Sequence, residues 1–261
     1  MTSARIFFVG GLMSYRALFG FISPWVFIPT LVVTPLFQIL LFAYIGRAAE
    51  LESDEFYVIG NALQYASVPA LFAMTFTISG ERFQQTLGYV LVTPAGRLPL
   101  FLGRSLPVIL NAAFVCALSL FLGGLVLGID VPASAFGPLA VAIVVSTLSC
   151  TGLGLVLAGI GLRVREVAVL NNIVFGFLLI FTGANAPLDE LPRWIDVLGH
   201  ALPLTHGIEA SRLLADGESL GGVSGLLARE LGLGLVYGTL GYLFLRFMED
   251  RSRRHATLET A

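Results

Sequence analysis

The chain of 261 residues has few charged residues. Asp, Glu, Lys and Arg together make up 12% of it, whereas hydrophobic residues make up 56%. Soluble domains carry roughly 25% charged residues, because polar groups have to cover a surface that faces water. The composition therefore excludes a water-soluble globule and indicates a protein of the lipid bilayer. The net charge of −2 identifies no partner, since the side on which each charge lies matters more in a membrane protein than the sum.

Lysine is absent, because all 15 basic residues are Arg. A nucleotide-binding loop of the G-x-x-x-x-G-K-[ST] type needs its Lys to reach the phosphates. Such a loop is excluded, so we expect any ATP chemistry to take place on another chain. Zinc-protease and serine-hydrolase motifs are missing as well, so no catalytic residue is predicted. The two cysteines, Cys116 and Cys150, lie in apolar runs and offer no disulfide framework.

Six apolar segments are long enough to cross a bilayer, which takes about 20 residues of helix. The predicted spans are approximately residues 21–46, 56–80, 105–129, 136–162, 167–188 and 226–247. The first five contain no charged residue and no His, so ion coupling within this chain is not expected. In the sixth, Arg229, Glu230 and Arg246 are expected to snorkel towards the membrane surface.

The arginines predict the orientation of the spans. With both termini in the cytoplasm, 11 of the 15 arginines fall on inner segments and only Arg47, Arg193, Arg212 and Arg229 on outer ones. Because Arg accumulates on the cytoplasmic side of membrane proteins, the termini are predicted to be cytoplasmic. Residues 4–18 mix Arg with apolar side chains and predict an interfacial helix. No repeat or linker divides the chain, so a single domain, residues 1–261, is expected.

Mild polar groups interrupt the second and fifth spans. They include Gln64 and Ser67, and the candidates for a substrate path are Thr75, Thr77, Ser79, Asn171 and Asn172. Such groups either bond to a neighbouring helix, at about 0.6 kcal/mol each, or line a path for an apolar or amphiphilic solute, and the sequence leaves both readings open. The spacings Gly124-x-x-x-Gly128 and Gly234-x-x-x-Gly238 are typical of close helix contact.

Two segments between spans carry more information. Residues 81–104 interleave apolar side chains with Arg and Gln at helical spacing, which predicts an amphipathic helix that contacts either a partner or lipid. Residues 183–214 carry prolines suited to helix starts and a Trp suited to the headgroup region. They predict two half-helices that enter the outer leaflet. His200, His206 and Glu209 match no standard zinc spacing, so no metal site is predicted.

Two motifs in these segments carry a family resemblance. The first is Glu81-Arg82-x-x-x-Thr86-Leu87 followed by Thr93-Pro94-x-x-Arg97. The second is Leu191-Pro192, ten residues, Pro203-Leu204-x-His206, five residues, and Arg212. In register with six spans, they resemble the permeases of type-2 ATP-binding-cassette (ABC) exporters, of the daunorubicin-resistance and nodulation-factor kind. Two departures are Gly88-Tyr89, where relatives often have an acidic residue, and Phe181, where a smaller residue is usual.

The resemblance implies an all-α polytopic membrane protein with six spans, an N-terminal interfacial helix and a re-entrant pair between spans five and six. It implies a bacterial inner-membrane exporter subunit that works with two copies of an ABC ATPase and a second permease, identical or homologous. No cofactor is expected on this chain, ATP and Mg are expected on the ATPase, and no nucleic acid is expected to bind. The implied coupling residues are Glu81, Arg82, Thr86, Leu87, Thr93, Pro94, Arg97 and Arg104. The implied outer gate consists of Pro187, Pro192, Trp194, Pro203, His206 and Arg212.

The alternative is a membrane scaffold or sensor that transports nothing and needs no ATPase. Nothing in the composition separates the two functions, whereas the paired motifs favour the exporter.

Overall fold

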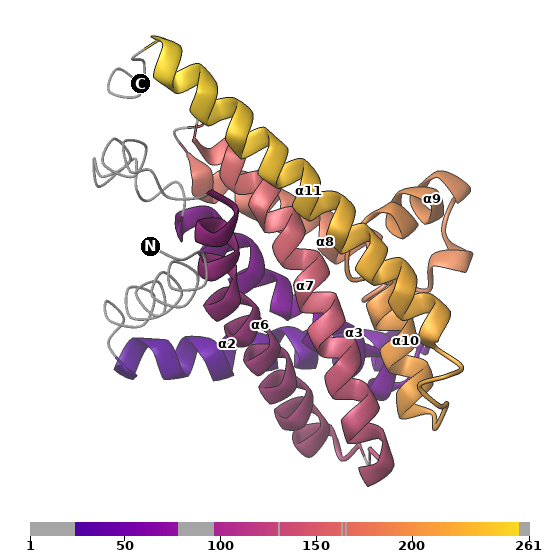
Figure 1. The fold of residues 1–261 in the computed structure, drawn as a ribbon. Helices are drawn as coiled ribbons and strands as arrows, with labels where there is room; N and C mark the ends of the chain where they lie inside the picture. Colours follow the sequence, from indigo (N-terminus) through magenta and orange to yellow (C-terminus); the bar gives the residue numbers. More distant parts are fainter. Residues whose placement is uncertain (1–23, 78–96, 130, 163, 165, 256–261) are drawn as a thin grey trace.

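The described part of the chain is helical. The computed structural model describes residues 24–77, 97–129, 131–162, 164 and 166–255, and no strand occurs within these ranges. Long helices form a bundle, and the short helix α9 (Arg193–Ala201) projects from its side (Figure 1). The predicted interfacial helix at 4–18 and residues 78–96, which contain Ser79 and most of the predicted coupling segment, lie outside the described residues.

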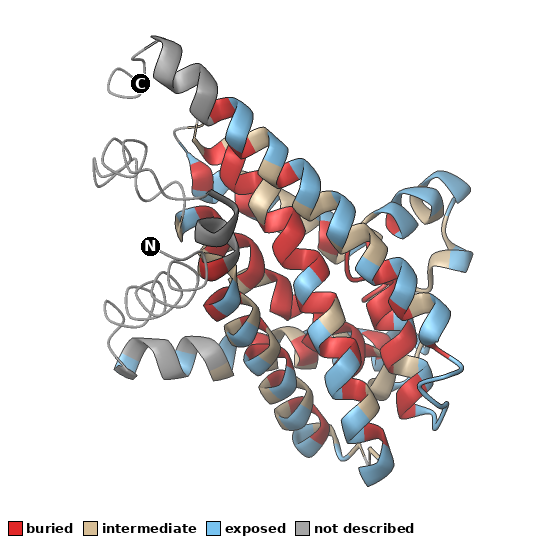
Figure 2. Cartoon of the chain, in the orientation of Figure 1, coloured by how far each residue is buried: buried red, intermediate tan, exposed pale blue. Residues whose placement is uncertain are grey.

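Among the residues that the structure describes, four helices are long and apolar enough to cross a membrane. The helices are α2 (Pro24–Ala49), α6 (Arg97–Leu127), α7 (Phe136–Gly161, preceded by the short turn η2, Ala133–Ala135) and α11 (Ser224–His255). They correspond to the first, third, fourth and sixth predicted spans. Large apolar side chains such as Phe121 on α6 and Leu235 on α11 are more than 60% exposed, whereas the inner faces of these helices are buried (Figure 2). Apolar side chains on the outside of a bundle are expected of helices that face lipid.

The second predicted span consists of two parts. Helix α3 (Asp54–Val68) runs into a π-helical turn, η1 (Pro69–Ala73), and helical structure continues to Thr77. Pro69 has no N–H to donate to the preceding turn, which accounts for the wide turn at this position. Residues from Tyr57 to Ser67 are buried throughout, so α3 occupies the interior of the bundle.

The fifth predicted span is shorter than expected. Helix α8 (Val167–Phe181) has 15 residues, or about 22 Å of helix, and ends well before residue 188. The Thr182 hydroxyl donates to the Leu178 carbonyl at 2.6 Å, and Gly183 then turns the chain with a φ of 75°. The predicted outer segment contains the turn η3 (Leu188–Glu190) and two short helices, α9 (Arg193–Ala201) and α10 (Thr205–Ala215).

Glycine brings α7 and α11 into backbone contact. Helix α11 runs along α7 (Figure 1), and a Cβ atom added to Gly152 would lie 2.7 Å from the Gly234 carbonyl oxygen. A Cβ added to Gly234 would lie 2.7 Å from the Cα of Ser149. Gly234 therefore makes the close helix contact that its spacing predicts. Gly128 does not, because it ends α6 at a φ of 71° with open space around it.

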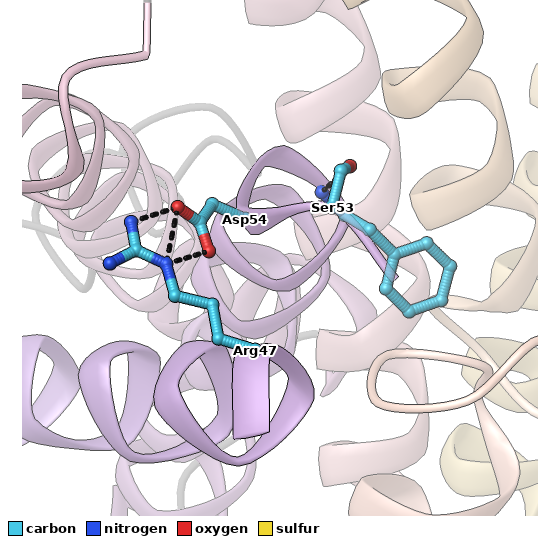
Figure 3. A network of polar contacts seen from close by, with 4 residues as sticks. Arg47, Ser53 and Asp54 are labelled. Carbon is cyan, nitrogen blue, oxygen red and sulfur yellow. Dashed lines mark hydrogen bonds and ion pairs between the residues drawn. The ribbon is translucent and has the colours of Figure 1, made fainter. Parts of the chain in front are cut away.

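An ion pair fixes the corner between α2 and α3 (Figure 3). The Arg47 guanidinium, in the last turn of α2, donates from Nε to Asp54 Oδ1 at 2.7 Å and to Oδ2 at 2.9 Å. The Ser53 hydroxyl accepts a hydrogen bond from the Phe56 N–H at 3.3 Å and caps α3. The carboxylate of Asp54 also lies at the helix N-terminus, where the helix dipole favours negative charge.

Candidate functional site

A line of buried polar contacts joins the second predicted span to α8 and to the turn that follows α8. The hydroxyl of Thr75 donates to the Leu71 carbonyl at 2.6 Å and lies 3.1 Å from Oδ1 of Asn171. Both Thr75 and Asn171 are completely buried. The structure thus brings together one residue from each of the two predicted polar spans, although they are 96 positions apart in the sequence.

Two further contacts continue this line towards α9 and α10. The Thr182 hydroxyl lies 3.2 Å from Oε1 of Gln64, and the side-chain amide of Asn61 donates to Oδ1 of Asn185 at 2.9 Å. Gln38 on α2 donates to Oδ1 of Asn61 at 3.1 Å. We call the contacts Thr75–Asn171, Gln64–Thr182 and Asn61–Asn185 the polar seam. An uncharged seam in an apolar bundle can offer hydrogen bonds to an amphiphilic solute without the cost of a buried charge.

The other predicted path residues in the described ranges lie apart from the seam. Thr77 donates to the Ala73 carbonyl at 2.6 Å. Asn172 is exposed on another side of α8 and donates to the Ala168 carbonyl at 2.9 Å. Both therefore bond to their own helices.

Arg104 connects the start of α6 to the end of the second predicted span. Its Nη1 donates to the Thr77 carbonyl at 3.2 Å. Of the other predicted coupling residues, Arg97 is the first residue of α6. The remaining six, Glu81, Arg82, Thr86, Leu87, Thr93 and Pro94, lie outside the described residues.

Arg212 on α10 connects three parts of the chain. Its Nη1 donates to the Gly183 carbonyl at 3.0 Å, and its Nη2 donates to the carbonyls of Phe56 and Ala184 at 3.1 Å each. The guanidinium carbon also lies 3.3 Å from the centroid of the Phe56 ring, in a cation–π contact. Burial lowers the pKa of Arg212 to about 10, so the side chain remains a cation at neutral pH. A charged α10 side chain thereby holds both the start of α3 and the turn after α8.

The prediction that Glu230 snorkels to the membrane surface is wrong. The residue is completely buried instead. Its Oε1 accepts a hydrogen bond from the Leu204 N–H at 2.7 Å, and its Oε2 accepts one from the Gly207 N–H at 3.3 Å. Leu204 has a φ of 81°, a conformation that exposes the first N–H groups of α10. The carboxylate in α11 therefore caps the N-terminus of α10.

The other predicted gate residues lie between the end of α8 and the first turn of α10. Pro192 is the N-cap residue of α9, and Trp194 is 61% exposed, with its ring centroid 6.1 Å from that of Phe181. Pro203 is buried just before α10, and His206 is 5% exposed in its first turn. Pro187 lines a cavity of about 370 Å³ together with side chains that include Asp189, Asp196, His200, Glu209 and Arg212.

Comparison with known proteins identifies the class. The pattern of the family described as "ABC-2 type transporter" matches residues 8–214. This match covers well over half of the 261 residues, so the chain belongs to the ABC-2 type transporter family. Members of this family are transport subunits and not enzymes themselves.

Two similar relatives come from Escherichia coli. The probable multidrug ABC transporter permease YbhR of strain K12 is 28% identical over 153 residues, which cover 53% of this chain and 40% of the relative. The protein of the same name in E. coli O157:H7 gives the same figures. The matched region thus spans about 40% of the length of these relatives.

Proposed function

We propose that this chain is the transmembrane permease subunit of an ATP-driven exporter. Its substrate is hydrophobic or amphiphilic, of the class of drugs, polyketides, lipids or lipid-linked glycans, and leaves from the cytoplasm or the inner leaflet. The observation that carries the proposal is the family match over residues 8–214, which covers the described helices from α2 to α9 and all of α10 except its last residue. The uncharged polar seam inside an apolar bundle supports a substrate of this kind.

The ATPase is proposed to be a separate subunit in two copies. The chain has no Lys, which excludes a phosphate-binding loop of the Lys-containing type. We therefore expect ATP and Mg to bind to the ATPase subunit. The complex also contains a second permease chain, identical or homologous, in the bacterial inner membrane, with both termini of this chain in the cytoplasm. Residues 81–104, with Arg82, Leu87 and Arg97, form the proposed contact with the ATPase.

The contacts of α3 suggest how ATPase closure is transmitted. Arg104, at the end of the proposed coupling segment, donates a hydrogen bond to the Thr77 carbonyl. Thr75, two residues before Thr77, contacts Asn171 in the polar seam. Near the start of α3, at the opposite end of the second predicted span, the Phe56 carbonyl and ring contact Arg212 of the proposed gate. Movement of α3 and η1 would therefore act on the seam and on α10 together.

Purification and reconstitution test this function. A full-length chain tagged at one terminus should co-purify with an ABC ATPase from its native membranes. The reconstituted complex should move an amphiphilic dye only when hydrolysable ATP is supplied. A chain that never binds an ATPase under these conditions is better explained as a scaffold or sensor. Dye movement that continues without ATP identifies an independent facilitator, and either result overturns the proposal.

A further inference from the structure

Three metal-binding side chains meet where α9 ends and α10 begins. One ring nitrogen each from His200 and His206 and one carboxylate oxygen of Glu209 lie within 4.8 Å of one another. His200 lies in the last turn of α9, whereas His206 and Glu209 lie one turn apart on α10. The turn at residues 202–204 folds the chain back, so that residues with no standard metal-site spacing in the sequence become neighbours.

The environment of each imidazole suits a metal ligand. His206 is 5% exposed, and its Nδ1 has no hydrogen-bond partner among the described residues. Burial, together with the charges of His200 and Arg229, lowers the pKa of His206, and the neutral form is the one that binds metal. An unpartnered buried nitrogen has an energetic cost that a bound cation would remove.

His200 is held by a neighbouring acid. Its Nδ1 lies 2.9 Å from the Asp196 carbonyl oxygen and 3.0 Å from the Asp196 carboxylate. When Nδ1–H donates to a carboxylate, Nε2 carries the free lone pair, which is the usual second-shell arrangement around a zinc-binding His. Asp196 therefore supplies a contact that sequence spacing does not reveal.

We propose that His200, His206 and Glu209 bind one divalent transition-metal ion, with Zn²⁺ the best fit. Two imidazoles and one carboxylate form a three-ligand zinc set that leaves a fourth position open. Mg²⁺ and Ca²⁺ fit less well because they prefer oxygen ligands. The site is independent of the proposed transport function, since it depends only on these side chains.

Small side-chain movements would complete the site. Two atoms that ligate one ion at about 2.1 Å can be no more than about 4.2 Å apart, slightly less than the 4.8 Å limit observed here. His200 has a side chain that is 43% exposed, and Glu209 is exposed, so both can rotate. Buried His206 provides the fixed ligand. The open position would face the 370 Å³ cavity that His200, Glu209 and Arg212 line, and the ion would hold α9 against α10.

Zinc binding to the purified full-length chain tests the proposal. The chain should carry an affinity tag without histidine and be stripped with a chelator. After addition of Zn²⁺ and removal of the excess, elemental analysis should find one Zn²⁺ per chain. His200→Ala and Glu209→Gln change exposed side chains and should each lower the affinity at least tenfold, and Asp196→Asn should lower it by about 10- to 100-fold. His255→Ala alters the third His of the sequence and should bind as the wild type does.

Cobalt reports the ligand geometry. Co²⁺ added to the stripped chain should give the intense visible bands of a four-coordinate site, and Zn²⁺ should abolish them. The proposal is wrong if Zn²⁺ is not retained, or if His200→Ala and Glu209→Gln retain it as tightly as the wild type. Equal loss in His255→Ala would also overturn it. None of these measurements requires an ATPase or a transported substrate.

Discussion

The carboxylate of Glu230 accepts a hydrogen bond from the backbone N–H of Leu204 at 2.7 Å, and this contact joins the longest described helix to the first turn of α10. Leu204 adopts a left-handed φ of 81°, which costs an L-residue with a branched side chain about 1 to 2 kcal/mol. The buried charge and the strained turn depend on each other. The carboxylate satisfies N–H groups of α10, and those groups together with the helix dipole compensate its burial.

Replacing Glu230 should destabilise the chain. Glu230→Ala leaves the buried N–H groups of Leu204 and Gly207 without an acceptor, at an expected cost of about 1 to 3 kcal/mol for each unsatisfied group. Glu230→Gln keeps one oxygen and should fall between wild type and Ala. Thermal unfolding of the detergent-purified chain would measure the order. Glu190→Gln, on an exposed turn, is the matched control, and an Ala variant that melts with the control would contradict the capping role.

The burial of Glu230 could not be predicted from the sequence. The residue stands near the start of an apolar window, and a charge in that position ordinarily snorkels. Its partners lie 26 and 23 positions earlier in the chain. Their N–H groups point to it only because Leu204 takes a left-handed φ, and neither hydropathy nor spacing predicts a backbone angle at a Leu.

Arg212→Lys should weaken the contact between α10 and α3. Lys keeps the charge but lacks the planar group that donates to three carbonyls and stacks on Phe56. We expect a loss of about 1 to 3 kcal/mol, measured as a lower melting temperature. Arg193→Lys changes an exposed Arg at the start of α9 and should have no effect. Equal melting temperatures for both variants would mean that the contacts of Arg212 carry no net stability.

Acid should destabilise the chain through His206. Burial, followed by the charges of His200 and Arg229, lowers the pKa of His206 below its ordinary value of 6.5. The unfolded chain therefore takes up a proton at His206 before the folded chain does, so this contribution is complete above about pH 6.5 and is lost as the pH falls. The metal-free chain should lose melting temperature between pH 7.5 and 5.5, and His206→Asn should lose less. An identical loss in both would exclude this titration.

Hydropathy located the long helices well because each is a long apolar run. It predicted α7 to within one residue at each end, but missed the start of α6, which begins at Arg97 and not at residue 105, and the polar extension of α11 to His255. It predicted too long a helix at α8, because Gly183 cannot be told from any other small residue in an apolar run until its φ is known.

The sequence predicted some of the residues of the polar seam but not how they pair. Thr75 and Asn171 stood out in their spans, whereas the pairing of Asn61 with Asn185 joins residues 124 positions apart.

Adjacent asparagines on α8 separate a path role from a general effect of the helix. Asn171 is buried in the seam, whereas Asn172 is exposed and bonds to its own helix. Asn171→Leu and Thr75→Val should therefore change the substrate range or the transport rate several-fold, with assembly of the complex retained. Asn172→Leu should have a smaller effect. Transport assays with several amphiphilic dyes would measure this, and equal effects of both Leu variants would indicate a general effect of α8 and contradict a path along the polar seam.

Variants in the proposed coupling segment should uncouple ATP hydrolysis from transport. Arg82→Ala and Arg97→Ala remove cations from residues 81–104, and Leu87→Asp puts a charge on the predicted apolar face of its amphipathic helix. In the reconstituted complex, we expect each variant to lower substrate-stimulated ATPase activity several-fold, while basal activity of the ATPase remains. Arg193→Ala is the control because α9 belongs to the predicted outer side. If all three variants stimulate the ATPase as the wild type does, another segment meets the ATPase and residues 81–104 lie on lipid instead.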